Sequence, residues 1–326
     1  MQVLVTGSNG FIGSHLVEKL VSKKYNVFCL IRKSSDLKWI EHLPVKFVYG
    51  DIIDYNSLIP VVKQMDYVYH LGGIVRARTE AEFERVNCDG TRNLLEACRL
   101  YNAQLKRFVF VSSQAAAGPS PNGIPLTEDK EPHPISAYGR SKLKAEAVVM
   151  NYADFFPVTI IRPPSVYGSR DDAIFVIFKM IKYRLKPLVG WKEKKISLVH
   201  IDDLVRGICL AAEHPQAENQ KFFIVNPAEY DWLEMMNLIS RIMKKKAMVV
   251  RIPELLLDVM AWFNEKLSRI FNYDAVLNME KAWEMKQNYW LISNSKAKKL
   301  LGFEPKVELE DGIEKTVDWY KNQGWL

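Results

Sequence analysis

The sequence predicts an α/β protein in which helices cover both faces of a doubly wound parallel sheet. Two observations predict this fold. Short, almost wholly apolar strands alternate with amphipathic helices along the first two thirds of the 326 residues, as in a parallel sheet buried on both faces. A glycine-rich turn lies between the first strand and the first helix. Together they indicate a Rossmann-type sheet with a smaller, mostly helical C-terminal substrate domain.

The elements are expected in regular alternation up to residue 167 and more loosely after it. The first strand, at 3–6, leads into a helix at 11–21, and further helices are expected at 83–100 and 138–152. Further strands are expected at 27–31, 45–49, 67–71, 108–111 and 158–161. After residue 167 we expect a helix at 174–183, a strand at 196–199, a helix at 202–213, a strand at 222–225 and mostly helix from 232 onward. We predict a dinucleotide-binding domain at 1–165 and a mainly substrate-binding domain at 166–326. Within the second range, residues 196–226 are expected to return to the first domain.

Composition excludes several classes of protein. Apolar residues make up 48% and charged residues 25% of the chain, as in globular proteins, and no uncharged apolar run is long enough to span a membrane. The net charge of +7 is spread over short runs, which argues against a nucleic-acid partner. The four cysteines form no C-x-x-C pair, so we expect no metal site and no disulfide, and the absence of a secretion signal favours the cytoplasm.

The turn after the first strand has the composition of a phosphate-binding loop. It reads Gly7-Ser8-Asn9-Gly10-Phe11-Ile12-Gly13. Glycines allow a tight turn and let a pyrophosphate approach the helix N-terminus, where free N–H groups and the helix dipole favour an anion. We therefore expect residues from Gly7 to Gly13, including Asn9, Phe11 and Ile12, to contact a dinucleotide.

The end of the second strand favours NADP over NAD, although NAD stays possible. Enzymes that use NAD usually place an acid there for the ribose hydroxyls, whereas this strand ends in Ile31-Arg32-Lys33. A guanidinium offers a planar fork of donors to a 2′-phosphate. The alternative is that Arg32 and Lys33 are only a solvated loop. After the third strand, Asp51 is placed either to accept a hydrogen bond from the adenine amino group or to cap a turn.

A tyrosine and a lysine four residues apart suggest acid/base chemistry. Tyr138 and Lys142 share a helix face, so the ammonium can lower the pKa of the phenol and also bind a ribose. Ser112 and Ser113 follow the strand at 108–111, at the sheet edge where α/β proteins bind ligands. Either hydroxyl could hold a substrate oxygen, and an ordinary turn or cap is the alternative.

The chain resembles the extended short-chain dehydrogenases/reductases, in the epimerase/dehydratase branch. The resemblance implies that Tyr138 is the acid/base, that Lys142 lowers its pKa, that Ser113 donates to the substrate and that Asn87 lies beside the nicotinamide. It also implies cofactor contacts at Ile52, Leu71, Gly72, Gly73 and Pro164. The matching motifs, in family order, are Thr6-Gly7-x-x-Gly10-Phe11-Ile12-Gly13, Gly50-Asp51, His70-Leu71-Gly72-Gly73, Val86-Asn87-x-x-Gly90-Thr91, Val111-Ser112-Ser113, Tyr138-x-x-x-Lys142, Arg162-Pro163-x-x-Val166-Tyr167-Gly168 and His200-Ile201-Asp202-Asp203.

Departures from the family pattern shift the expected substrate toward an apolar secondary alcohol or ketone. The acid pair of the dehydratases is replaced by Gln114 and Ala115, and a usual tyrosine is Ala117. Ile196 stands where nucleotide-sugar enzymes carry an arginine that grips the diphosphate, although Lys195 or Arg170 could substitute. This favours a pattern like that of hydroxysteroid dehydrogenases and dihydroflavonol reductases. A nucleotide-sugar 4-epimerase with tightly bound NAD and a redox-silent cofactor-binding scaffold are the alternatives.

Two further expectations concern partners. The helices at 82–100 and 137–152 resemble the pair that forms a four-helix contact in dimeric relatives, which implies a homodimer. The stretch at 252–263 is a helix rich in large apolar residues, and packing in the core of the small domain is the favoured interpretation. A roof over an apolar pocket or peripheral contact with a membrane is the alternative.

Overall fold

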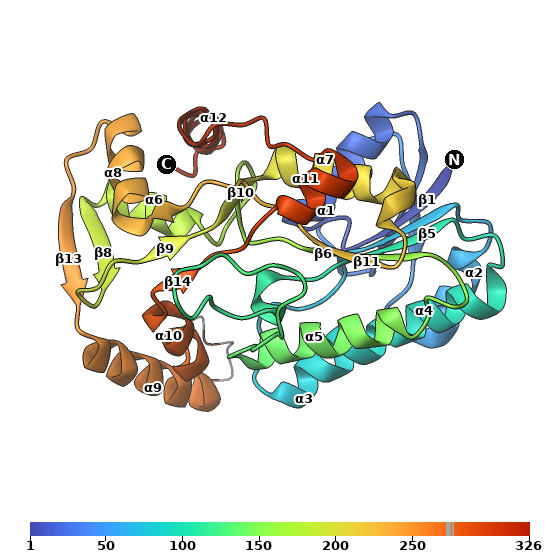
Figure 1. Cartoon of the computed structure of the whole chain (residues 1–326), viewed down its shortest axis with the longest axis horizontal. Helices are drawn as coiled ribbons and strands as arrows, with labels where there is room; N and C mark the ends of the chain where they lie inside the picture. The colour runs from blue at the N-terminus through green and yellow to red at the C-terminus, as the bar shows by residue number, and fades with distance from the viewer. Residues whose placement is uncertain (272–274, 276) are drawn as a thin grey trace.

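A seven-stranded parallel sheet forms the centre of the larger part of the molecule (Figure 1). The computed structural model describes all residues except 272–274 and 276. The strand order, β11-β6-β5-β4-β1-β2-β3, changes direction beside β1. In open α/β sheets the ligand crevice lies at this switch point, beyond the carboxyl ends of the strands. The strands are β1 (Gln2–Thr6), β2 (Asn26–Ile31), β3 (Lys46–Tyr49), β4 (Tyr67–His70), β5 (Arg107–Val111), β6 (Val158–Arg162) and β11 (Gln220–Phe223).

Helices bury both faces of this sheet, as the apolar strands require. Helices α1 (Phe11–Ser22) and α7 (Ile201–Glu213) cover one face and share its core with β1 and β2. Helices α2 (Tyr55–Val62), α4 (Gly90–Tyr101) and α5 (Ala137–Met150) cover the other face. The short helix α2 was not predicted from the sequence. It has eight residues with Pro60 inside it, too short for a clear helical period.

Two predicted elements are interrupted in the structure. The helix expected at 83–100 is divided into α3 (Glu80–Phe83), a π-helical segment (Glu84–Asp89) and α4. The strand expected at 196–199 is divided at Ser197 into β9 (Lys195–Ile196) and β10 (Leu198–His200). These two pieces join different sheets: β10 pairs with β7 (Ser165–Tyr167), while β9 lies between β12 (Tyr230–Asp231) and β14 (Tyr289–Trp290).

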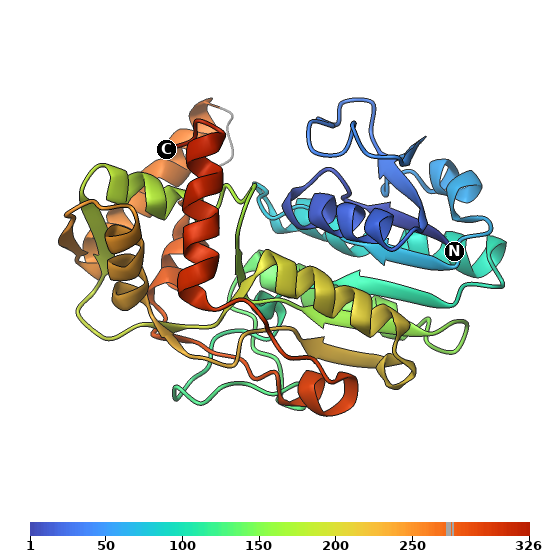
Figure 2. The same cartoon turned by 90° about the horizontal axis from the view of Figure 1, so that it is seen from above.

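The smaller part of the molecule is helical around short sheets (Figure 2). A second core forms where α6 (Phe175–Lys182), α8 (Trp232–Ile242) and α12 (Leu309–Asn322) meet. Beside it, β8 (Leu185–Val189) pairs in parallel with β13 (Met248–Ile252), a pair that was not predicted. The chain then enters α9 (Glu254–Phe271) and α10 (Met279–Lys286).

Helix α9 corrects the expectation that this segment packs into a core. Leu257 and Ala261 are buried, but most of the large apolar side chains of α9 face outward. Leu255 is 76% exposed, whereas Leu257 is 2% exposed. Two leucines in the same helical turn thus lie in opposite environments, and periodicity alone could not show which face was inward.

The chain returns to the large sheet twice after residue 166. Helix α7 and strand β11, within the predicted return at 196–226, pack on it or extend it. Helix α11 (Ser295–Leu301) is a second return, because Ala297, Leu301 and Phe303 belong to the same core as α1 and α7. We propose that residues 1–165, with these returns, form the cofactor domain and that the rest forms the substrate domain.

Candidate active site

The turn after β1 forms a close-packed cradle at the N-terminus of α1. Gly7 has a φ of +66°, which favours glycine. A Cβ on Gly13 would lie 2.0 Å from the carbonyl oxygen of Gly7, so no side chain fits there. Gly10 is the N-cap of α1 and has no side chain to cover the first amides, Phe11 and Ile12 among them. This cradle fits the pyrophosphate of a dinucleotide.

The end of β2 lies beside this cradle and is basic. Arg32 and Lys33 are exposed directly after β2, which pairs with β1 through Thr6 and Leu30. The backbone N–H of Arg32 donates to Ser35 Oγ at 3.0 Å, which fixes the turn. Asn9 ties the glycine turn to the same loop, because its Nδ2 donates to the carbonyl of Asp36 at 3.1 Å. These contacts hold the backbone of the loop that carries Arg32 beside the glycine turn.

The loops after β3 and β4 complete the cofactor side. Asp51 Oδ1 accepts from the N–H of Ile53 at 3.2 Å, so the carboxylate caps its own turn. Ile52 is buried against Gly90, where a Cβ would lie 2.9 Å from the Ile52 side chain. Gly72 N–H donates to Thr6 Oγ1 at 2.9 Å, and a Cβ on Gly72 would lie 2.9 Å from the same hydroxyl. Sequence reasoning missed this role of the Thr6 hydroxyl.

Asn87 fastens the loop after β4 to helix α5. It lies in the π-helical segment, a feature that often marks functional sites. Its Oδ1 accepts from Ile74 N–H at 2.8 Å, and its Nδ2 donates to the Ile74 carbonyl and to Ser141 Oγ, each at 3.0 Å. Asn87 is almost fully buried. A Cβ on Gly73 would lie 2.7 Å from Asn87 Oδ1, so these contacts also set the course of Leu71–Gly73.

Ser113 and Tyr138 are brought together because α5 begins close to the loop after β5. A Cβ on Gly139 would lie 2.4 Å from the Ala115 carbonyl oxygen, so only glycine permits this approach. Ser136 caps the helix by accepting from Gly139 N–H at 3.2 Å. Burial raises the pKa of Tyr138 to about 12, against the lowering effect of its hydrogen bond with Ser113. The role of Gly139 was not foreseen from the sequence.

Lys142 extends from α5 toward the end of β5. Its Nζ donates to the Val111 carbonyl at 2.9 Å and lies 4.5 Å from the centroid of the Phe110 ring. Burial lowers the pKa of Lys142 to about 8, although Glu146 opposes this. The pKa of Tyr138 is raised rather than lowered, and Lys142 is not among the causes. A neutral phenol is suited to donate a proton.

The two serines after β5 have different partners. Ser112 Oγ donates to Glu146 Oε1 at 2.6 Å, and Glu146 forms a buried ion pair with Arg162, at 2.6 Å between Oε2 and Nη2. Ser113 Oγ instead accepts from Ala115 N–H at 3.1 Å and lies by the phenol. Ser112 therefore belongs to the scaffold. Pro164 is buried directly after β6, in the same layer.

The short helical turn that follows Ser113 contains one buried amide and leads into an apolar cluster. Ala117 is buried with Phe223, Val225 and Ile292. Gln114 is also buried, and its Nε2 has no hydrogen-bond partner among the residues that the structure describes. This amide can donate to a polar group of a substrate. No cluster of metal-ligating side chains is found in the described part of the chain.

A glycine cradle at the switch point of a parallel sheet, with a serine and a tyrosine at its edge, defines a nicotinamide-dependent enzyme. The chain belongs to the NAD dependent epimerase/dehydratase family, whose model matches residues 3–226. It is an enzyme of the extended short-chain dehydrogenase/reductase type, as the sequence predicted.

Among the similar proteins are a reductase, a dehydrogenase and a nucleotide-sugar epimerase. The ceramide reductase of Caulobacter vibrioides is 29% identical over 99% of this chain and 96% of its own. The decarboxylating sterol-4-alpha-carboxylate 3-dehydrogenase of Bos taurus is 27% identical over 96% and 90%. The solved UDP-glucuronic acid 4-epimerase of Bacillus cereus, in complex with UDP-glucuronic acid and NAD, is 26% identical, covers 99% of this chain and 100% of its own, and has a TM-score of 0.79.

Proposed function

We propose that this enzyme reduces an apolar ketone to a secondary alcohol, or the reverse, and releases the product. The observation that supports an apolar ketone over a nucleotide sugar concerns Arg170 and Lys195. These are the two basic residues that could replace the diphosphate-binding arginine that this chain lacks. Arg170 pairs with Glu18 at 2.5 Å and donates to Ser14 Oγ at 3.1 Å. Lys195 lies 3.7 Å from Glu229 and 3.9 Å from Glu193. Both cations are already partnered, which disfavours a nucleotide-sugar substrate.

The surroundings support the same substrate class. Ile196, at the position of the family's arginine, is buried in the apolar core of the smaller part of the molecule. Ala117, at the position of a usual tyrosine, is buried in a second apolar cluster. A buried apolar wall binds apolar groups and penalises unpaired charge. The names of the ceramide reductase and the sterol dehydrogenase support a lipid-like alcohol or ketone.

The placement of the residues supports the following roles in this proposal. When bound, the nicotinamide supplies or accepts the hydride. Ser113 holds the carbonyl oxygen, and Tyr138, protonated at neutral pH, donates the proton that this oxygen takes up during reduction. Lys142 binds the ribose. Asn87 holds the Leu71–Gly73 loop against the nicotinamide end.

We assign the cofactor to the cradle described above, with NADP favoured by Arg32 and Lys33. The proposed cofactor contacts are Gly7, Asn9, Gly10, Phe11, Ile12, Gly13, Arg32, Lys33, Asp51, Ile52, Leu71, Gly72, Gly73, Tyr138, Lys142 and Pro164. For Asp51, the carboxylate oxygen that does not accept from Ile53 can accept from an adenine amino group.

The experiment is an absorbance assay at the reduced nicotinamide band. Purified protein is mixed with NADPH or NADH and with long-chain and steroidal ketones. We expect net consumption of the reduced cofactor with at least one ketone. Interconversion of UDP-sugars without consumption of added cofactor would overturn the proposal.

Nucleotide-sugar 4-epimerisation is the second candidate. Similarity to the NAD-bound UDP-glucuronic acid 4-epimerase covers 99% of this chain, more than the shared sheet alone requires. The assay above distinguishes the two reactions, because epimerisation consumes no cofactor.

We also propose a homodimer through the outer faces of α4 and α5. Arg140 of α5 pairs with Glu80 of α3 at 2.7 Å, which holds α5 against α3. Leu100 and Tyr101, at the end of α4, are exposed and free of a core. A two-fold contact of this kind should bury on the order of 1,600 Å². Light scattering that shows only monomer at micromolar concentration would contradict it.

A further inference from the structure

Helix α9 turns only Leu257 and Ala261 of its apolar residues between 255 and 263 inward, and its other large apolar side chains there face outward. The inward Ala261 packs with Val189, Leu257 and Ala282 in a small core. Large exposed side chains continue to the end of the helix at Ile270 and Phe271, and the six between residues 255 and 263 form what we name the α9 face: Leu255, Leu256, Val259, Met260, Trp262 and Phe263. In a helix that only completes a protein core, the large apolar side chains would point inward.

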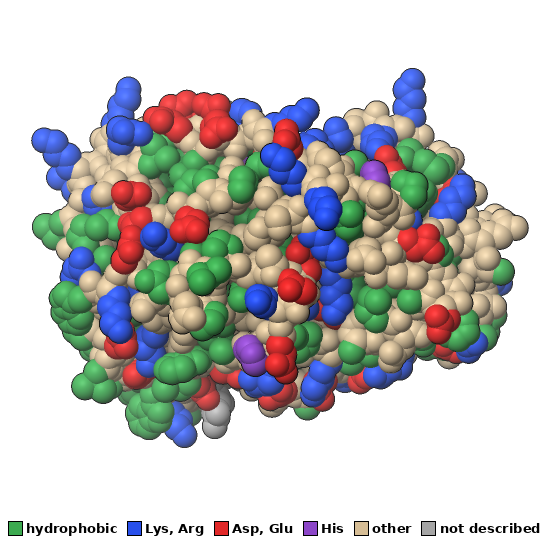
Figure 3. All heavy atoms as spheres, viewed as in Figure 1, with side chains coloured by type: hydrophobic (Ala, Val, Ile, Leu, Met, Phe, Trp, Pro, Cys, Tyr) green, Lys and Arg blue, Asp and Glu red, His purple; other side chains and the backbone are tan. Residues whose placement is uncertain are grey.

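The α9 face is broad, continuous and without acidic side chains. At about 100° per residue, its six members span about 160° of the helix circumference. Lys266 lies within that arc, with its Nζ 5.8 Å from the centroid of the Trp262 ring. The described acids of α9 lie outside the arc, and Asp258 is bound by Lys286 of α10 at 2.6 Å. Figure 3 shows apolar side chains gathered over α9 at the lower left of the molecule.

Two stretches of chain that lead toward this face are basic, and we name them the basic flanks. Residues 241–253, which lead through β13 into α9, contain five basic and no acidic residues, and residues 173–192, which lead through β8, contain the same numbers. The β8–β13 pairing brings the two stretches together: Met248 N–H donates to the Arg184 carbonyl, and Arg251 Nη1 donates to the Gly190 carbonyl at 3.0 Å. Trp191, 66% exposed, and the exposed Lys192 follow directly.

We propose that the α9 face and its basic flanks dock on a lipid bilayer that carries anionic headgroups. An amphipathic helix that lies in the interface buries large apolar side chains among the acyl chains, and nearby lysines and arginines attract anionic lipid. Lys266 can extend along the face to a phosphate. No described helix is long and apolar enough to cross a membrane, so α9 would lie in the surface plane.

The positive charge around the α9 face favours a bilayer over a second copy of the chain as its partner. A two-fold contact through the α9 face would bring Lys266 and the basic flanks of both copies together, and the face contains no acid to pair with them. An anionic surface pairs with the same cations. This inference goes beyond the proposed reaction and does not rest on it.

The test is flotation of the full-length protein with vesicles of phosphatidylcholine alone or of phosphatidylcholine and phosphatidylglycerol in equal amounts. We expect wild type to float with the mixed vesicles, more weakly with the neutral ones, and less as salt is raised. Leu255→Gln with Phe263→Gln should lower the partition coefficient by about tenfold or more. Lys266→Glu should weaken binding to the mixed vesicles and leave binding to neutral ones little changed.

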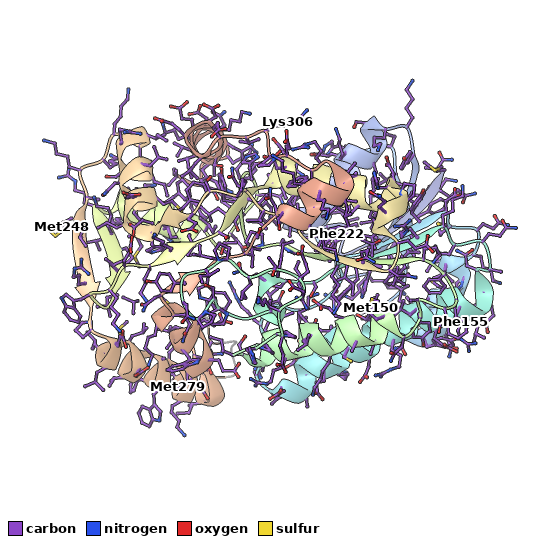
Figure 4. The ribbon with its side chains drawn as sticks, in the orientation of Figure 1. Met150, Phe155, Phe222, Met248, Met279 and Lys306 are labelled. Atoms are coloured by element: carbon purple, nitrogen blue, oxygen red, sulfur yellow. The ribbon has the colours of Figure 1, made fainter. Side chains whose placement is uncertain are left out.

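The matched control is Phe155→Gln, an equally exposed aromatic residue at the opposite end of the molecule from α9 and α10 (Figure 4). It should float like wild type, and all variants should keep the wild-type circular dichroism spectrum. Wild type that floats with neither vesicle would overturn the proposal. A dimer in sedimentation that the double α9 variant converts to monomer would also overturn it, since a second copy would then cover the face.

Discussion

The glycine cradle and helix α9 differ in how tightly the chain packs around them. Around the cradle, close approach of backbone segments leaves no room for a side chain, as at Gly13 and Gly139. Around α9, large side chains have space because they point away from the protein. In the first region, packing places the reacting groups. In the second, large apolar side chains stay exposed in the single chain, and we propose that a partner surface covers them.

The largest effect is expected where the packing is tightest. Tyr138→Phe removes the proton that the phenol donates and keeps the ring, so kcat should fall by about 10²- to 10⁴-fold. Cofactor affinity should stay near that of wild type. Steady-state kinetics with a ketone substrate, together with cofactor titration by fluorescence, measure both. A phenylalanine variant with wild-type turnover would remove Tyr138 from the mechanism.

The second prediction compares two leucines in one turn of α9. Leu257→Ala should lower the free energy of unfolding by about 2 to 5 kcal/mol, because it leaves a cavity beside Ala261 and Val189. Leu255→Ala makes the same chemical change at an exposed position and should stay within about 0.5 kcal/mol of wild type. Urea denaturation measures both. Equal losses would show that the α9 face is not free in solution.

The third prediction concerns the basic strand end beside the cradle. Arg32→Ala removes a charge-assisted contact with the 2′-phosphate and should weaken NADP roughly 10- to 150-fold, while NAD stays nearly unchanged. Lys33 can share the phosphate, which would give the lower end of that range. Dissociation constants for both cofactors test this. A wild-type preference for NAD, or equal weakening of both cofactors, would contradict the assignment.

The smallest effect is a pH dependence set by Lys142. Burial lowers the pKa of this lysine to about 8, so its charge is lost above that pH. If the ammonium binds the ribose, kcat/KM for the reduced cofactor should fall about tenfold per pH unit above 8.

The free energy of unfolding should change in the opposite direction over the same pH range. Between the folded pKa of about 8 and the ordinary value of 10.5, the unfolded chain binds more protons at Lys142 than the folded protein does. The free energy of unfolding should therefore rise with pH in that window through this group. Lys142→Met should lose this contribution, and an unchanged slope in that variant would contradict the shifted pKa.

The sequence predicted the parallel sheet and the cradle because both depend on local signals. Short apolar strands and a glycine turn directly after the first of them can be recognised without knowledge of distant contacts. The nicotinamide-dependent chemistry also followed, through the order of the motifs. The roles of the individual site residues stay predictions.

What could not be predicted depends on contacts between distant segments. The approach of Gly139 to Ala115, the turn of Lys142 toward Val111 and the pairing of β8 with β13 each join separate parts of the chain. The direction of α9 was missed for the same reason. Its apolar residues cover so much of the helix that the pattern did not identify the inward side, and Val189 and Ala282 supply that information.

The most direct test of the central claim is transfer of deuterium from reduced cofactor that carries deuterium at both positions of the nicotinamide C4, so that hydride transfer from either face delivers the label. The enzyme is incubated with labelled NADPH and the ketone that the absorbance assay selects, and the product is analysed by mass spectrometry. Net ketone reduction predicts one deuterium on the carbinol carbon of the released alcohol, and its loss with Tyr138→Phe. An unlabelled product, or a UDP-sugar interconverted while the added cofactor stays intact, would contradict the account.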